Sequence, residues 1–161
     1  MRNQTPELSG LVLDSLTESV AMIDASGVII GVNAAWRDFA GDNGGECGQY
    51  YVGQDYLAAC KHAHELHEDE SARAMYEGLK SVLDGDRSSF SIEYPCHAPD
   101  QPRWFVAHVT RCRDTPIPRF VVAHEDVTVR KLAELKVERT EPANSTFLAG
   151  GKTTLELLEW N

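Results

Sequence analysis

Strand-like segments lie in two separate parts of this sequence, with helical segments between them. The first part holds two short apolar runs around the turn Asp24-Ala25-Ser26-Gly27, a pattern that predicts a β-hairpin. We expect five strands in all, at residues 20–24, 28–32, 89–94, 103–112 and 119–127. Because these strands are segregated from the helices instead of alternating with them, the sequence predicts an α+β fold with an antiparallel sheet.

The helical segments are defined by apolar spacing and by capping residues. Residues 69–84 give the clearest pattern, with apolar side chains at helical spacing and Gly85 where a left-handed C-cap belongs. Asn33 and Asp55 stand directly before two shorter helical segments and are favoured N-cap residues. We expect helices at residues 7–17, 34–40, 56–60, 69–84 and 128–139.

The length of 161 residues suits one domain with a short appendage, and it is too short for a sensor joined to a kinase or cyclase. The predicted divisions are an N-terminal helical cap at 1–17, a core at 18–128, a C-terminal helix at 129–139 and a tail at 140–161. The tail is predicted to be flexible, with a short apolar end. Its acidic character favours a stand-alone protein.

Charge and composition exclude several functional classes. Lys and Arg number 15 against 25 Asp and Glu, which leaves a net charge of −10 and argues against a nucleic-acid partner. No apolar run approaches the roughly 18 residues of a membrane span, and no signal peptide is visible, so we expect a cytoplasmic protein without membrane insertion. No catalytic constellation stands out, and we expect no enzymatic activity.

Short motifs follow one another along most of the chain. They are the turn Asp24-x-x-Gly27, Gly31-Val-Asn33-x-x-Trp36, Gly53-x-x-Tyr56-Leu57, Glu93-Tyr94-Pro95-Cys96-His97, Arg103-Trp104-Phe105 and Asp126-Val127-Thr128-x-Arg130-Lys131. Their order and spacing over about residues 7–139 resemble the PAS family, the sensory domains of bacterial signalling proteins. The resemblance implies a five-stranded antiparallel sheet with short helices packed on one face.

The resemblance also implies an internal pocket for a small ligand or cofactor. The candidate lining residues are Asn33, Trp36, Phe39, Tyr56, Leu57, Met75, Phe90, Tyr94 and Trp104. Asn33 and Tyr56 are the candidate polar contacts for a ligand. The alternative is that these side chains simply fill the core, because a domain of this size needs large apolar groups to bury enough surface.

An output route is implied as well. In such domains the last strand continues through a triplet, here Asp126, Val127 and Thr128, into a helix that pairs in a dimer. The helix at 129–139 would be the signalling helix, and Asp126 and Thr128 would tie the strand end to the core. The expected partners are a second copy of the chain and a protein of a two-component or related pathway, such as a histidine kinase or diguanylate cyclase.

The cofactor is not determined by the sequence. Tyr56 stands where flavin-binding light-oxygen-voltage domains carry a reactive Cys, which argues against flavin–cysteine photochemistry. If residues 60–67 are helical, Cys60, His64 and His67 share one face and could ligate haem or a metal. A haem-binding gas or redox sensor is therefore an alternative, and a solvated connector is the competing interpretation of the same stretch.

Two further histidines, His108 and His124, fall on neighbouring predicted strands. If the hairpin folds about Pro116, they lie within a residue or two of register, and facing imidazoles would form a proton-sensing pair. Neutral sheet histidines with one hydrogen bond are the alternative. The function that follows is a sensory domain that relays a cue by dimerisation, with a ligand-free dimerisation adaptor as the alternative.

Overall fold

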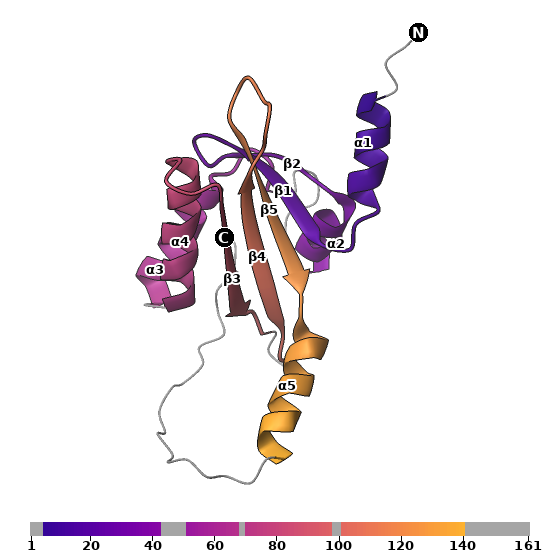
Figure 1. The fold of residues 1–161 in the computed structure, drawn as a ribbon, viewed down its shortest axis with the longest axis vertical. Coiled ribbons are helices and arrows are strands. Elements are labelled where there is room, and N and C mark those ends of the chain that lie inside the picture. The colour runs from indigo at the N-terminus through magenta and orange to yellow at the C-terminus, as the bar shows by residue number, and fades with distance from the viewer. Residues whose placement is uncertain (1–4, 43–50, 68–69, 98–100, 141–161) are drawn as a thin grey trace.

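The computed structural model describes residues 5–42, 51–67, 70–97 and 101–140, and Figure 1 shows their arrangement. One five-stranded antiparallel sheet has the order β2-β1-β5-β4-β3. The strands are β1 (Ser19–Asp24), β2 (Ile29–Val32), β3 (Ser89–Pro95), β4 (Trp104–Arg111) and β5 (Arg119–Asp126). The helices are α1 (Thr5–Asp14), α2 (Ala34–Asp42), α3 (Tyr56–His67), α4 (Glu70–Leu83) and α5 (Thr128–Thr140). The predicted α+β fold, with helices on one face of an antiparallel sheet, is confirmed.

The turn between β1 and β2 is held by Asp24 and Gly27. Asp24 Oδ1 accepts hydrogen bonds from the backbone N–H groups of Ser26, at 2.9 Å, and Val28, at 3.1 Å. Gly27 has a φ of +91°, a conformation that favours glycine. A Cβ at Gly27 would lie 2.8 Å from the Cβ of Leu57, so the first turn of α3 packs directly against the hairpin.

Two of the predicted helix caps are confirmed. Asn33 Oδ1 accepts a hydrogen bond from the Trp36 N–H at 3.0 Å, and Asp55 Oδ1 accepts one from the Ala58 N–H at 2.9 Å. α3 continues to His67, well past the expected end at residue 60, and α1 lies about two residues earlier than expected. The predicted tail at 140–161 lies almost wholly outside the described residues.

The core lies between α4 and the sheet. The largest fully buried side chains come from both layers: Ile23, Ile29, Leu79, Val82, Val109, Phe120 and Val122. Gly78 of α4 sits against the Phe90 ring, where a Cβ would come within 2.3 Å of it. The helix therefore approaches β3 as closely as a backbone can, and the predicted apolar face of 69–84 is confirmed.

Strand register decides which side chains face the helices. In β4, Phe105, Ala107 and Val109 are buried, whereas the residues between them point to the other face. Ala107 pairs with His124 of β5, which places the His124 side chain on this inner face. The inner face carries the site described next, and the outer face carries more exposed polar groups.

Candidate functional site

A polar cluster of Tyr56, Tyr94 and His124 lies at the edge of the apolar core, with Tyr56 buried and the other two residues partly buried. The Tyr56 hydroxyl is 2.9 Å from His124 Nε2, and the Tyr94 hydroxyl is 2.7 Å from His124 Nδ1. The three side chains come from α3, β3 and β5, respectively. Both imidazole nitrogens are therefore occupied, and the cluster links the helical layer to two strands of the sheet.

Aromatic rings enclose the cluster. The Trp36 ring lies 5.7 Å from the His124 ring, and Tyr94 stacks on Phe105 with ring centroids 6.1 Å apart. Burial lowers the pKa of His124 to about 4, and His108 adds a smaller repulsion. Burial also raises the pKa values of Tyr56 and Tyr94 well above their usual value. The cluster is accordingly uncharged near neutral pH.

The structure brings most of the candidate pocket residues together. Trp36, Tyr56 and Met75 are buried in one apolar cluster, and Leu57, Phe90 and Tyr94 are partly buried against it. Phe39 joins this set through the Phe105 ring, with centroids 5.7 Å apart. These contacts place the side chains in one region of the core, and a role in binding a ligand stays a prediction.

Asn33 does not offer a free polar group to a ligand. The side chain is 3 % exposed, and its Oδ1 accepts from the N–H groups of Val20, at 2.8 Å, and Trp36. Its Nδ2 donates to the carbonyl oxygens of Leu13, at 3.1 Å, and Glu18, at 2.9 Å. Because an amide side chain has two donor hydrogens and one acceptor oxygen, these bonds use it fully. Asn33 holds α1, β1 and α2 together, which corrects its expected role.

Trp104 also departs from the expected pocket. It pairs with Pro95 at the start of β4, and the alternation of the strand turns its side chain to the face opposite Phe105. Its ring instead contacts His97, with centroids 4.8 Å apart. Its backbone N–H and carbonyl groups bond the junction between β5 and α5.

The expected proton-sensing pair does not form. His108 pairs with Ala123, and His124 pairs with Ala107, so the two histidines are one register step apart. One step reverses the face of the sheet, which puts the two imidazoles on opposite sides. His108 is exposed, and its Nδ1 lies 2.8 Å from the Ser91 hydroxyl.

The candidate metal face on α3 gains little support. Burial raises the pKa of Cys60 to about 12, so the thiol is protonated in the metal-free chain. His64 Nδ1 is buried and has no hydrogen-bond partner among the described residues, and the His67 side chain lies outside them. In the described part of the chain, no group of three His, Cys, Asp or Glu side chains could hold a metal ion.

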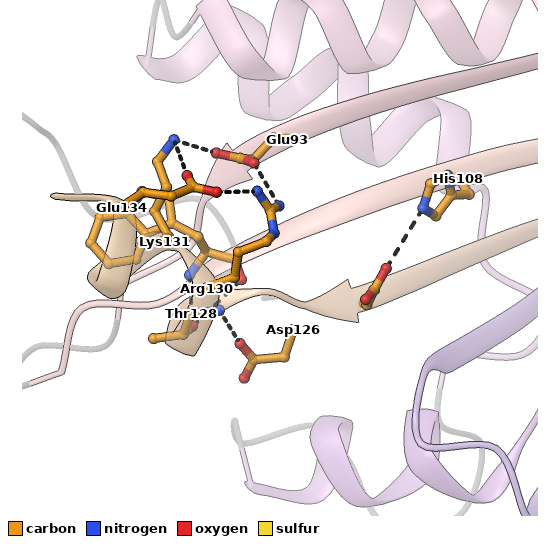
Figure 2. A network of polar contacts seen from close by, with 9 residues as sticks. Glu93, His108, Asp126, Thr128, Arg130, Lys131 and Glu134 are labelled. Carbon is orange, nitrogen blue, oxygen red and sulfur yellow. Dashed lines mark hydrogen bonds and ion pairs between the residues drawn. The ribbon is translucent and has the colours of Figure 1, made fainter. Parts of the chain in front are cut away.

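The junction between β5 and α5 is a second polar site, drawn in Figure 2. The Val127 N–H donates to the Trp104 carbonyl at 2.9 Å, and Thr128 Oγ1 accepts from the Trp104 N–H at 3.0 Å. Asp126 Oδ1 accepts from the Thr128 N–H at 2.9 Å. Thr128 and the buried Val127 thus tie the strand end to β4, whereas Asp126 is exposed and caps the helix locally.

An ionic cluster on the surface holds the first turns of α5 to β3. Glu93 lies 2.9 Å from Arg130 and 2.6 Å from Lys131, and Arg130 also binds Glu134 at 2.8 Å (Figure 2). The hydrogen bonds from Lys131 and Arg130 lower the pKa of Glu93. This cluster was not predicted from the sequence. The i,i+4 spacing of Arg130 and Glu134 was a visible signal, but Glu93 lies 37 residues from Arg130 in the chain.

A family model described as PAS fold matches residues 13–132, about three quarters of the chain. The chain belongs to the PAS fold family. PAS domains are typical of sensory and signalling proteins and are generally without catalytic activity. Among the described residues of this PAS domain, no helix combines the length and the apolar character needed to cross a membrane.

Individual relatives agree with the family. The chain is 42% identical over 123 residues to an uncharacterized 104.1 kDa protein in the hypE 3′ region of Rhodobacter capsulatus, covering 76% of this chain and 13% of that protein. The PAS domain of Bordetella pertussis BvgS has a TM-score of 0.52 at 17% identity, over 84% of this chain and 99% of that one. An RNA-binding light-oxygen-voltage receptor has a TM-score of 0.60 at 13% identity, over 86% and 38%. At these identities the two structures support the fold alone.

Proposed function

We propose that this PAS domain passes a change in its core to α5, and from there to a separate signalling protein. The observation that carries the proposal is the β5–α5 junction. Only Val127 separates β5 from α5, and Val127 and Thr128 are both bonded to Trp104. A displacement of β5 would therefore move the first turn of α5, with Glu93 holding the helix in one orientation.

A homodimer through α5 is part of the proposal. Val129 is 84% exposed, and Leu132, one turn further along the helix, is 37% exposed. Successive helical residues are rotated by about 100°, so Val129 and Leu132 lie on the side of α5 opposite the residues that bind Glu93. The ionic cluster thus turns an apolar stripe outward, where a second α5 could cover it.

The proposed recipient is a histidine kinase or diguanylate cyclase. The relative from Rhodobacter capsulatus is a 104.1 kDa protein, and the chain spans only 13% of its length. This size supports a role for such a domain as one part of a larger signalling assembly. The partner would read the separation or rotation of the paired α5 helices.

We propose no catalytic role. On the outer face of the sheet, the Ser91 hydroxyl, the His108 imidazole and the Glu125 carboxylate do lie in a row. The distance from His108 Nε2 to Glu125 Oε2 is 3.9 Å, too long for a hydrogen bond. Both of these side chains are about half exposed, and water there would weaken the electrostatic stabilisation that an acyl-transfer site requires.

A ligand-free dimerisation adaptor is the second candidate. It is favoured by the way Tyr56, Tyr94 and His124 satisfy one another without a ligand. Native mass spectrometry of the purified chain separates the two candidates. A retained small molecule supports a ligand-binding sensor, and a dimer of bare protein mass supports the adaptor.

Sedimentation equilibrium on the full 161-residue chain tests the α5 dimer. The double variant Val129→Glu/Leu132→Glu places two charges in the stripe and should weaken self-association by about 100-fold or more. Leu11→Glu is the matched control, because Leu11 is an equally exposed apolar residue, at 68%, on α1. A monomeric wild-type chain, or a dimer disrupted by Leu11→Glu but not by the α5 variant, would contradict the proposal.

A further inference from the structure

Core packing alone does not explain the position of the polar cluster of Tyr56, His124 and Tyr94. His124 stands on β5 two residues before Asp126, where that strand ends. Tyr56 is the first residue of α3, and Tyr94 is the last but one of β3. The imidazole is thus the point at which α3 is hydrogen-bonded to the strand that leads into α5.

The hydrogen bonds of the cluster have a preferred direction. A neutral imidazole carries one N–H and one lone pair, so one tyrosine must donate to it and the other must accept. Tyr56 also hydrogen-bonds the thiol of Cys60, one turn further along α3. If Tyr94 donates to Nδ1, then Nε2–H can donate to the Tyr56 oxygen, and the Tyr56 hydroxyl can donate to Cys60.

The reverse direction leaves a proton without an acceptor. There Tyr56 would donate to Nε2 and Nδ1–H would donate to the Tyr94 oxygen, so the Tyr94 hydroxyl would need a further acceptor. Among the described residues, the Tyr94 side chain hydrogen-bonds only to His124. Tyr94 as a whole is partly buried, but desolvation of its hydroxyl raises its pKa, and a desolvated hydroxyl without an acceptor is unfavourable. The first direction is therefore preferred.

We propose that His124 couples α3 to the output junction, held as the neutral Nε2–H tautomer by a one-way chain of hydrogen bonds from Tyr94 to Cys60. The proposal rests on α5 being the output element. A shift of α3 would pull on His124 through Tyr56, and the backbone of β5 would carry that pull to Val127 and Thr128. Cys60 sets the direction of the chain because it is the terminal acceptor.

Nitrogen-15 NMR of the histidine side chains in the full chain at pH 7 tests the tautomer. The wild-type His124 should show a protonated Nε2 and an unprotonated Nδ1. Cys60→Ala removes the terminal acceptor and should convert this pattern into a mixture of the two tautomers, and Cys60→Ser, which restores an acceptor, should recover it. A protonated Nδ1 in the wild type, or no change in Cys60→Ala, would overturn the proposed direction.

Amide hydrogen exchange tests the coupling. Tyr56→Phe deletes one oxygen and should raise the exchange rate of the Val127 amide about threefold to tenfold beyond any change at the core residue Leu79. Tyr76→Phe on α4, outside the cluster, is the matched control and should leave the ratio of the Val127 and Leu79 exchange rates unchanged. Equal changes in exchange rate at Val127 and Leu79 would show that Tyr56 only stabilises the fold, and would overturn the coupling.

The two proposals fail in different ways. If the α5 stripe variants leave the dimer intact while Tyr56→Phe still loosens Val127, the output proposal is wrong and the coupling through His124 stands. If the dimer depends on the stripe but Val127 does not respond to Tyr56→Phe, the coupling is wrong and the output proposal stands.

Discussion

Two polar networks meet near the end of β5, one inside the core and one on the surface. The inner network consists of Tyr56, His124 and Tyr94, is uncharged near neutral pH and is enclosed by aromatic rings. The surface network consists of Glu93, Arg130, Lys131 and Glu134, is fully charged and is in contact with water.

Hydrogen bonds of similar length contribute very different free energies in the two networks. Buried groups that lose a hydrogen-bond partner cannot be rescued by water, whereas exposed ions can exchange a partner for solvent at little cost. The inner network should therefore determine stability and respond to protons. The surface network should contribute little stability but should respond to salt and set the orientation of α5.

The largest effect on the free energy of unfolding should come from removing the buried helix cap Asn33, and it should far exceed the effect of removing the exposed cap Asp126. Asn33→Ala removes four hydrogen bonds from a side chain that is 3 % exposed and should lower the free energy of unfolding by about 3 kcal/mol or more. Asp126→Ala removes one bond from an exposed cap and should cost about 1 kcal/mol or less. Urea unfolding measures both losses in unfolding free energy. Equal losses would contradict the expected difference between buried and exposed hydrogen bonds.

The next effect is the pH dependence contributed by His124. The unfolded chain binds a proton at the ordinary pKa near 6.5, and the folded chain binds it only near pH 4. Stability from this group is therefore complete above pH 6.5 and falls as the pH drops to 4, by up to about 3 kcal/mol. Tyr56 and Tyr94, which bond the imidazole, stay neutral in this window because their pKa values are raised, and His108 disfavours the protonated imidazole further.

Unfolding titrations between pH 4 and 7 on the wild type and His124→Gln measure this contribution. The glutamine keeps a donor and an acceptor but does not titrate, so its profile should be flatter by up to the same amount. His108→Gln is the matched control on the outer face of the sheet. A His124→Gln profile parallel to the wild type would show that the imidazole is not shielded as the structure indicates.

The smallest effect should come from the surface network. Glu93→Gln should lower the free energy of unfolding by less than about 1 kcal/mol, and salt near 1 M should remove the difference. Because the pKa of Glu93 is lowered in the folded state, its contribution is present above about pH 4.5 and is lost as the carboxylate is protonated below that. Glu77→Gln, within a pair on α4, is the control. A salt-independent loss of several kcal/mol would contradict this account.

The sequence predicts the elements and their order well, because each depends on local patterns. The alternation of Ser89 to Tyr94, the helical spacing of 69–84 and the caps at Asn33 and Asp55 are all visible within a few residues. The triplet at 126–128 was likewise located correctly as the point where strand passes into helix. Its role in relaying a signal stays a prediction.

The site was harder to predict because it depends on long-range pairing. Tyr56, Tyr94 and His124 were each singled out, but a single step of register decides whether His124 meets the tyrosines or His108. The hairpin sequence does not determine that step. Glu93 and Lys131 meet only because α5 leaves β5 next to the start of β4, the strand that separates β5 from β3, a geometry that no local pattern encodes.

The claim that both networks act on the junction between β5 and α5 can be tested directly with a double-mutant cycle. Hydrogen exchange of the Lys131 amide, which donates to the Val127 carbonyl at 2.9 Å, would be measured in the wild type, Tyr56→Phe, Glu93→Gln and the double variant. The account predicts a coupling free energy above about 0.5 kcal/mol, because both changes loosen one structural unit. Effects that add within about 0.3 kcal/mol would show that the core and the surface act independently, and would contradict the account.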